Sequence, residues 1–75
     1  MKAYVLINAC VGKSREVENK VRQIPGIKTA HCCWGRPDVF AFVDVANDVA
    51  LADTVLAKIQ TIDGIESTDT HIVIE

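Results

Sequence analysis

Hydrophobic and polar positions along this chain alternate first with the period of a strand and then with the period of a helix. Residues 3–9 place alternate side chains on two faces, as a strand does. The next segment has a single apolar stripe at helical spacing, made of Val17, Val21 and Ile24. Gly12 and Ser14 are expected at its start. Pro25 and Gly26 end it, because proline cannot continue a helix and glycine accepts a left-handed turn.

The rest of the chain predicts two more strands, a helix and a final strand. Apolar runs at residues 27–34 and 39–45 indicate two strands joined by a four-residue hairpin connection. A second helix is expected after Asn47, whose side-chain oxygen suits the N-cap. Its apolar stripe consists of Leu51, Val55, Ile59 and Ile62. Residues 65–75 alternate again and predict the last strand.

The two halves of the chain are related by a repeat. Residues 24–28 and 62–66 read Ile-Pro-Gly-Ile-Lys and Ile-Asp-Gly-Ile-Glu, at an offset of 38 positions. Two copies are too few for a solenoid, which needs about three or more units, so the halves must pack on each other. This order is typical of an α+β, ferredoxin-like βαββαβ domain, in which two helices cover one face of a four-stranded antiparallel sheet.

Both faces of the predicted sheet are apolar, although two helices can cover only one of them. One face carries Val5, Ile7, Val39, Ala41 and Val43, and the other carries Tyr4, Leu6, Phe40 and Phe42. At roughly 25 cal/mol per Å², leaving several such side chains in water would forgo on the order of 10 kcal/mol, comparable to the stability of a small domain. We therefore expect a homodimer that packs sheet on sheet.

Composition narrows the possible functions. The chain of 75 residues, 49% of them hydrophobic, is expected to form one domain spanning residues 1–75. It has no membrane-length apolar run and no secretory signal, so we expect a cytoplasmic protein without a membrane partner. A net charge of −2 and scattered Lys and Arg residues argue against direct binding of nucleic acid. The three cysteines, Cys10, Cys32 and Cys33, are expected to be reduced thiols.

Four segments in order resemble one known family. They are Ala3-Tyr4-Val5-Leu6-Ile7, the turn Ile24-Pro25-Gly26-Ile27, Gly35 with Asp38, and Thr68-Asp69-Thr70-His71-Ile72-Val73-Ile74. Together they resemble the effector-binding domain of Lrp/AsnC transcriptional regulators, called RAM, for regulation of amino-acid metabolism. The resemblance covers essentially the whole chain and is closest to stand-alone members that lack a helix-turn-helix. It implies a dimeric α/β barrel that can assemble to octamers or decamers, a small amino-acid effector bound where dimers meet, and a full-length Lrp/AsnC regulator as a partner.

The resemblance also implies a set of ligand-binding residues. They are Gly35 and Asp38 on the loop between the second and third strands, and Thr68 and Thr70 on the last strand. Trp34 and Arg36, on the same loop, are added as candidates, although both positions depart from the pattern of many relatives. Gly35 amides and the threonine hydroxyls could donate to a carboxylate, and Asp38 could accept from an ammonium group. Ordinary structural roles stay open, because Gly, Pro and Asp dominate turns and threonine is a good strand former. Arg36 is expected at subunit boundaries, and Trp34 departs from the smaller polar residue of many relatives, which leaves the ligand unidentified.

A metal site is not expected, although His31, Cys32 and Cys33 are possible ligands of zinc or copper. On a strand, His31 and Cys33 would point to one face and Cys32 to the other, so at most two of them converge. The chain also has no Cys-x-x-Cys motif. We predict neither a metal nor a cofactor.

Two other functions stay open. A small dimeric barrel enzyme would use His31 or His71 with Asp44 or Asp69, but no nucleophile with an activating base is evident. No catalytic residue is therefore predicted. A ligand-independent interaction subunit would use the same surfaces to join a full-length regulator, and it differs from a sensor in needing no small molecule.

Overall fold

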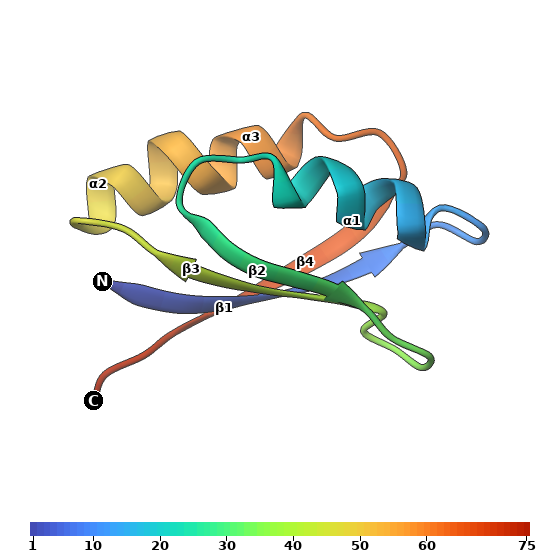
Figure 1. The fold of residues 1–75 in the computed structure, drawn as a ribbon, viewed down its shortest axis with the longest axis horizontal. Helices are drawn as coiled ribbons and strands as arrows, with labels where there is room; N and C mark the ends of the chain where they lie inside the picture. The colour runs from blue at the N-terminus through green and yellow to red at the C-terminus, as the bar shows by residue number, and fades with distance from the viewer.

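Four strands form one antiparallel sheet in the order β2-β3-β1-β4, and all the helices lie on one side of it (Figure 1). The computed structural model describes residues 1–75. The strands are β1 (Lys2–Ala9), β2 (Ile27–Cys32), β3 (Val39–Asp44) and β4 (Ile65–Ile72). The helices are α1 (Ser14–Arg22), α2 (Asp48–Ala50), η1 (Leu51–Leu56) and α3 (Ala57–Gln60). The predicted α+β class and βαββαβ order are confirmed.

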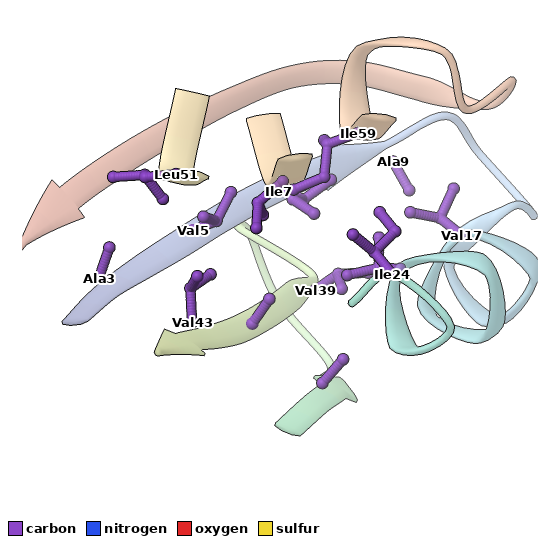
Figure 2. Close-up of a cluster of buried hydrophobic side chains, with 14 residues drawn as sticks. Ala3, Val5, Ile7, Ala9, Val17, Ile24, Val39, Val43, Leu51 and Ile59 are labelled. Carbon is purple, nitrogen blue, oxygen red and sulfur yellow. The ribbon is translucent and has the colours of Figure 1, made fainter. Parts of the chain in front are cut away.

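The core lies between the helices and the sheet face that they cover (Figure 2). All 14 buried residues are apolar. β1 and β3 contribute alternate positions because successive side chains point to opposite faces, β2 contributes only Ala30, and β4 contributes none. They are Ala3, Val5, Ile7, Ala9, Val17, Val21, Ile24, Ala30, Val39, Ala41, Val43, Leu51, Val55 and Ile59. None of the helices has the length and apolar character needed to cross a lipid bilayer.

The opposite face of the sheet has no covering element within the chain, and we call it the open face. It carries the alternate strand residues Lys2, Tyr4, Leu6, Asn8, Thr29, His31, Phe40, Phe42, Asp44, Ser67, Asp69 and His71. Tyr4 is 49% exposed and Phe40 is 40% exposed. The Tyr4 and Phe42 rings pack together with their centroids 5.0 Å apart. The predicted apolar second face is thus present and uncovered in the single chain.

The second helix contains a π-helical segment, which the sequence pattern did not predict. α2, η1 and α3 follow one another without a break over residues 48–60. Its buried residues Leu51, Val55 and Ile59 recur every fourth position, whereas an α-helix turns once in about 3.6 residues. The three side chains share the face of the helix that packs against the sheet. As predicted, Asn47 is the N-cap, and its Oδ1 accepts from the Ala50 amide at 2.9 Å.

Two predicted strand ends are wrong. β2 ends at Cys32 and not at Trp34, so the hairpin connection spans residues 33–38 and is longer than predicted. The Trp34 side chain has no sheet neighbour and is fully exposed. β4 ends at Ile72 and not at Glu75, because its partner β1 begins at Lys2 and the Val73 amide makes the last bond, to the Lys2 carbonyl, at 2.9 Å.

The start of α1 also differs in detail from expectation. Ser14 is the first helical residue, as the pattern suggested, but Lys13 occupies the N-cap and no side chain caps the helix. Ile24 is buried, although it lies beyond the helix end, and Ile62 is only partly buried. The apolar stripes therefore predicted which residues are buried more accurately than they predicted where the helices begin and end.

Candidate functional site

The loop 33–38 lies at the end of the sheet where β1 stops. β3 begins opposite Ile7 of β1, and Ala9 lies two residues further along β1. The amide and carbonyl of Ala9 that point toward β3 therefore have no β3 residue to pair with. On the other side of β1, the register with β4 shifts between Asn8, which faces Ser67, and Ala9, which faces Ile65. This bulge leaves Glu66 without a partner residue. The end of β1 therefore needs hydrogen-bond partners from outside the ladder.

Two loop side chains supply those partners. The Ala9 amide donates to Asp38 Oδ1 at 2.8 Å, and Arg36 Nη1 donates to the Ala9 carbonyl at 2.8 Å. The Asp38 side chain is only 16% exposed. Asp38 and Arg36 thus hold the hairpin loop onto β1, and one oxygen of the Asp38 carboxylate is already occupied within the chain.

Arg36 also connects the loop to β4. Its Nη2 donates to Glu66 Oε1 at 2.7 Å, while Nη1 lies 3.9 Å from Asp38 Oδ2. The Arg36 and Glu66 side chains are half or more exposed, so this ion pair contributes little to stability by itself. It places the guanidinium across the end of β1. The predicted role of Arg36 between subunits stays a prediction, and within the chain Arg36 is already paired.

The other predicted ligand-binding residues lie apart from this cluster. Thr68 and Thr70 share one strand face, partly buried, opposite Ile7 and Val5. They lie on the helix side of the edge strand β4, and no hydrogen bond joins them to the loop. A Cβ added at Gly35 would meet no atom within 4 Å, so its backbone is open to approach. The structure brings Arg36 and Asp38 together and leaves Thr68 and Thr70 separate from them.

No pocket is enclosed within the single chain. The predicted ligand-binding residues lie on its surface, with Trp34 fully exposed at the loop. Small-molecule sites usually bury roughly 70–90% or more of the surface of a drug-sized ligand. These residues could therefore enclose a ligand only together with a second surface.

The structure also shows a polar cluster that the sequence analysis missed. The Cys32 amide donates to Glu18 Oε2 at 2.9 Å, and Arg22 Nη2 donates to the Ala30 carbonyl at 2.7 Å. Arg22 also lies 3.3 Å from Glu18 Oε1. Glu18 lies outside the apolar stripe of the helix, yet its side chain is only 17% exposed. The i,i+4 spacing of Glu18 and Arg22 on the predicted helix was the one feature of the sequence that indicated this ion pair.

This cluster satisfies two backbone groups on the free edge of β2, the Ala30 carbonyl and the Cys32 amide, which edge strands otherwise leave unpaired. The backbone hydrogen bond from Cys32 is the main reason that the pKa of Glu18 lies below its ordinary value of 4.5. Arg22, the Cys32 side chain and His31 lower the pKa further, whereas partial burial acts in the opposite direction. The carboxylate form of Glu18 is therefore favoured in the folded protein.

Replacing Glu18 with glutamine is expected to destabilise the fold at neutral pH by about 1–2 kcal/mol, because the hydrogen bond from Cys32 loses its charged acceptor. A lowered folded-state pKa contributes stability above the unfolded-state pKa, and that contribution is lost as the pH falls through the folded-state value. The difference between the wild type and Glu18→Gln should therefore shrink below about pH 4.5. Urea unfolding between pH 3 and 7 measures it. Glu16→Gln, on the exposed side of α1, is the control and should show a smaller difference throughout.

The remaining titratable candidates form one close pair, His71 and Asp69. His31 and Cys32 lie on opposite faces of β2, and Cys33 lies outside the strand. No three side chains of His, Cys, Asp or Glu come together in the chain. His71 Nε2 lies 3.0 Å from Asp69 Oδ2 on the open face, and both side chains are mostly exposed. Ser67 on the same strand accepts from the Asn8 side chain at 3.0 Å, and no nucleophile is bonded to His71.

Comparison with known proteins decides the family. A family model described as the Lrp/AsnC ligand binding domain matches residues 2–75. The chain belongs to this family. The match spans the loop 33–38 and strand β4, so the proposed resemblance is confirmed over essentially the whole chain.

Solved structures of Lrp/AsnC proteins have the same fold. FFRP-DM1 is 30% identical, with a TM-score of 0.88 over 97% of this chain and 97% of that one. Escherichia coli AsnC is 27% identical, with a TM-score of 0.87 over 99% of this chain and 50% of AsnC. The transcriptional regulator NMB0573 from Neisseria meningitidis, solved as a complex with L-Met, is 17% identical, with a TM-score of 0.82 over 99% of this chain and 49% of that one. No curated protein sequence gives a significant match.

NMB0573 is described as a transcriptional regulator, and the Lrp/AsnC domain is a regulatory, effector-binding module. The chain spans about half of AsnC but nearly all of FFRP-DM1.

Proposed function

We propose that this Lrp/AsnC domain binds an amino acid at a contact between its own dimers, and that binding changes its assembly and thereby the activity of a transcription regulator. The observation that supports this proposal most strongly is the family match over residues 2–75. The regulator NMB0573 was solved as a complex with L-Met. That relative supports an amino acid as the class of effector.

A site between subunits fits the geometry of the single chain. Because no pocket is enclosed, the exposed loop 33–38 needs an opposing surface to bury a ligand. Trp34 is fully exposed there, and tryptophan is among the residues that contribute most to interface energies. Arg36 could offer its guanidinium to a ligand carboxylate in place of Glu66, since both groups of this pair are solvent-accessible.

Pairing of two chains through the open face is the other part of the proposal. The aromatic and aliphatic side chains there are adjacent on the central strands β1 and β3. Stacked sheets pack about 10 Å apart with interdigitated side chains, so a second copy would remove this apolar area from water. The dimer is then the unit that assembles further through loop 33–38.

A ligand-independent interaction subunit is the second candidate. The specific observation in its favour is that Asp38, the expected acceptor for an ammonium group, is mostly buried and bonded to the Ala9 amide. In this case the exposed Trp34 would dock on a neighbouring dimer or regulator without a small molecule. The two candidates use the same surface and differ only in the need for an effector.

A thermal-shift screen with each standard amino acid at ~10 mM tests the effector. An amino acid that binds only the folded form with a Kd of about 1 mM adds about 1.4 kcal/mol, and for a domain of this size that raises the melting temperature by roughly 6–11 °C. Trp34 is the only tryptophan, so its fluorescence should change with the same concentration dependence. No shift with any amino acid would contradict the effector and favour the second candidate.

Variants localise the site once an active amino acid is found. Thr68→Val and Thr70→Val keep the shape of a strand-forming side chain and remove the hydroxyl donor. Both should keep the melting temperature of the free protein within about 2 °C and lose most of the ligand-induced shift. Thr54→Val, in η1, is the matched control and should retain the full shift.

A further inference from the structure

The Arg36 guanidinium has one anchored nitrogen and one exchangeable nitrogen. Nη1 donates to the Ala9 carbonyl at 2.8 Å, and Ala9 is a buried residue whose carbonyl has no partner on β3. Nη2 donates to Glu66 Oε1 at 2.7 Å. The Glu66 side chain is 60% exposed. A carboxylate from outside the chain can therefore replace Glu66 at Nη2 while Nη1 keeps its bond to Ala9.

Glu66 reaches Arg36 because of the bulge in β4. The pairing of β1 with β4 passes from Asn8 with Ser67 to Ala9 with Ile65, so Glu66 has no partner residue on β1. The Glu66 carboxylate makes no hydrogen bond within the chain other than the one from Arg36. Displacing Glu66 therefore breaks one exposed ion pair and leaves the ladder of the sheet intact.

The same ion pair connects two parts of the site. Loop 33–38 bonds to β1 through its backbone and through Asp38, but its only hydrogen bond to β4 is the one from Arg36 to Glu66. Loss of that bond frees the loop from the strand that carries Thr68 and Thr70. A ligand that occupies Arg36 would thus change how the loop is held.

We infer that Glu66 is a resident carboxylate that occupies Arg36 in the absence of effector, and that the effector binds by displacing it with its own carboxylate. This inference rests on the proposed function and adds a regulatory contact to the same site. Because the effector must compete with Glu66, its apparent affinity is lower than the free guanidinium would give. Glu66 therefore sets the effector concentration at which the site fills.

The charges at the loop also narrow the chemical class of the effector. Arg36 is the one cation of loop 33–38, and it lies between two carboxylates, that of Glu66 and that of Asp38 at 3.9 Å. An effector carboxylate on Arg36 leaves Glu66 without its partner, so a positive group on the effector is needed to balance the site. The α-ammonium group of a neutral or basic amino acid supplies it. Aspartic and glutamic acid add a further negative charge and are expected to bind more weakly.

Glu66→Gln tests the competition, because it keeps the size of the side chain and removes its charge. The affinity for an amino acid found in the thermal screen should rise about two- to fivefold, the range expected for removing one exposed ion pair. Titration of Trp34 fluorescence measures the dissociation constant. The melting temperature of the free protein should change by no more than about 4 °C. Asp53→Asn, an equal charge change at an exposed position of η1, is the control and should leave the affinity unchanged.

Two further measurements separate competition for Arg36 from a general loosening of the loop. The amide of the same amino acid has no carboxylate, so Glu66→Gln should not tighten its binding. In an Arg36→Gln background the added Glu66→Gln should likewise have no effect, because both changes remove the same contact. Circular dichroism verifies that the variants fold. A gain in affinity that persists with the amide, or without Arg36, would overturn the inference.

The outcomes distinguish this inference from the proposed function. An unchanged or weaker affinity of Glu66→Gln for an amino acid that binds the wild type would overturn the competition and leave the effector site intact. No response of either the wild type or Glu66→Gln to any amino acid would overturn both. Tighter binding by Glu66→Gln, restricted to ligands with a free carboxylate, supports both.

Discussion

Replacing Gly26 with alanine is expected to lower the free energy of unfolding by about 4 kcal/mol, which combines backbone strain and overpacking. Gly26 has φ 98°, a conformation that an L side chain rarely adopts. An added Cβ would lie 2.7 Å from Val45 Cγ1 and 3.1 Å from Val55 Cγ2. Both methyl groups belong to branched, packed side chains and can move little. Urea unfolding at neutral pH and fixed protein concentration measures the loss.

Gly12→Ala is the matched control for this substitution. Gly12 has φ 79°, but a Cβ there would meet nothing within 4 Å, so only backbone strain of about 1–2 kcal/mol is expected. The difference between the two variants isolates the contact with Val45 and Val55. Equal losses would show that the turn after α1 does not pack against the second helix as described.

Replacing Phe40 with lysine is expected to raise the dissociation constant of the proposed dimer at least about 100-fold. The side chain lies in the middle of the open face, is 40% exposed in one chain, and would become buried in the dimer. An ammonium group there would be desolvated without a partner. Sedimentation equilibrium measures the change. Val49→Lys is the control, because Val49 is 62% exposed on α2, away from the open face, and should leave the dimer intact.

An unchanged dissociation constant for Phe40→Lys would contradict pairing through the open face. A fall in the stability of the folded chain would not explain a positive result, since Phe40 lies outside the buried core. Circular dichroism at the concentrations used for sedimentation separates these two effects.

The periodicity of the sequence was sufficient to divide the residues of β1 and β3 between the two faces of the sheet, but not to determine which face the helices cover, since both faces are apolar. Val5 and Ile7 point to the helices and Tyr4 and Leu6 point away from them, because alternation along a strand leaves only two faces to choose between. The apolar size of both sets then predicted the open face. The family resemblance rested on short segments in order, and the match over residues 2–75 confirmed it.

Contacts between residues far apart in the chain were not predictable in the same way. Asp38 is 29 positions from Ala9, and its bond to the Ala9 amide arises because β3 begins opposite Ile7. Glu18 reaches Cys32 for a similar reason, since α1 crosses beside the free edge of β2. Residue type marked Asp38 as a turn residue, and Glu18 lay outside the apolar stripe of its helix. Neither observation indicates which unpaired backbone group lies near the side chain in the folded chain.

The two edge strands of the sheet, β2 and β4, differ in their capacity to pair with another strand. Glu18 and Arg22 occupy the backbone groups of β2 at Cys32 and Ala30, whereas no side chain bonds to the outer backbone of β4. If a strand of another chain can add at only one edge of the sheet, at most two sheets can join edge to edge. Fibril growth requires that both edges accept a strand. Glu18 and Arg22 of α1 therefore leave fewer backbone groups on the β2 edge with which a strand of another chain could pair.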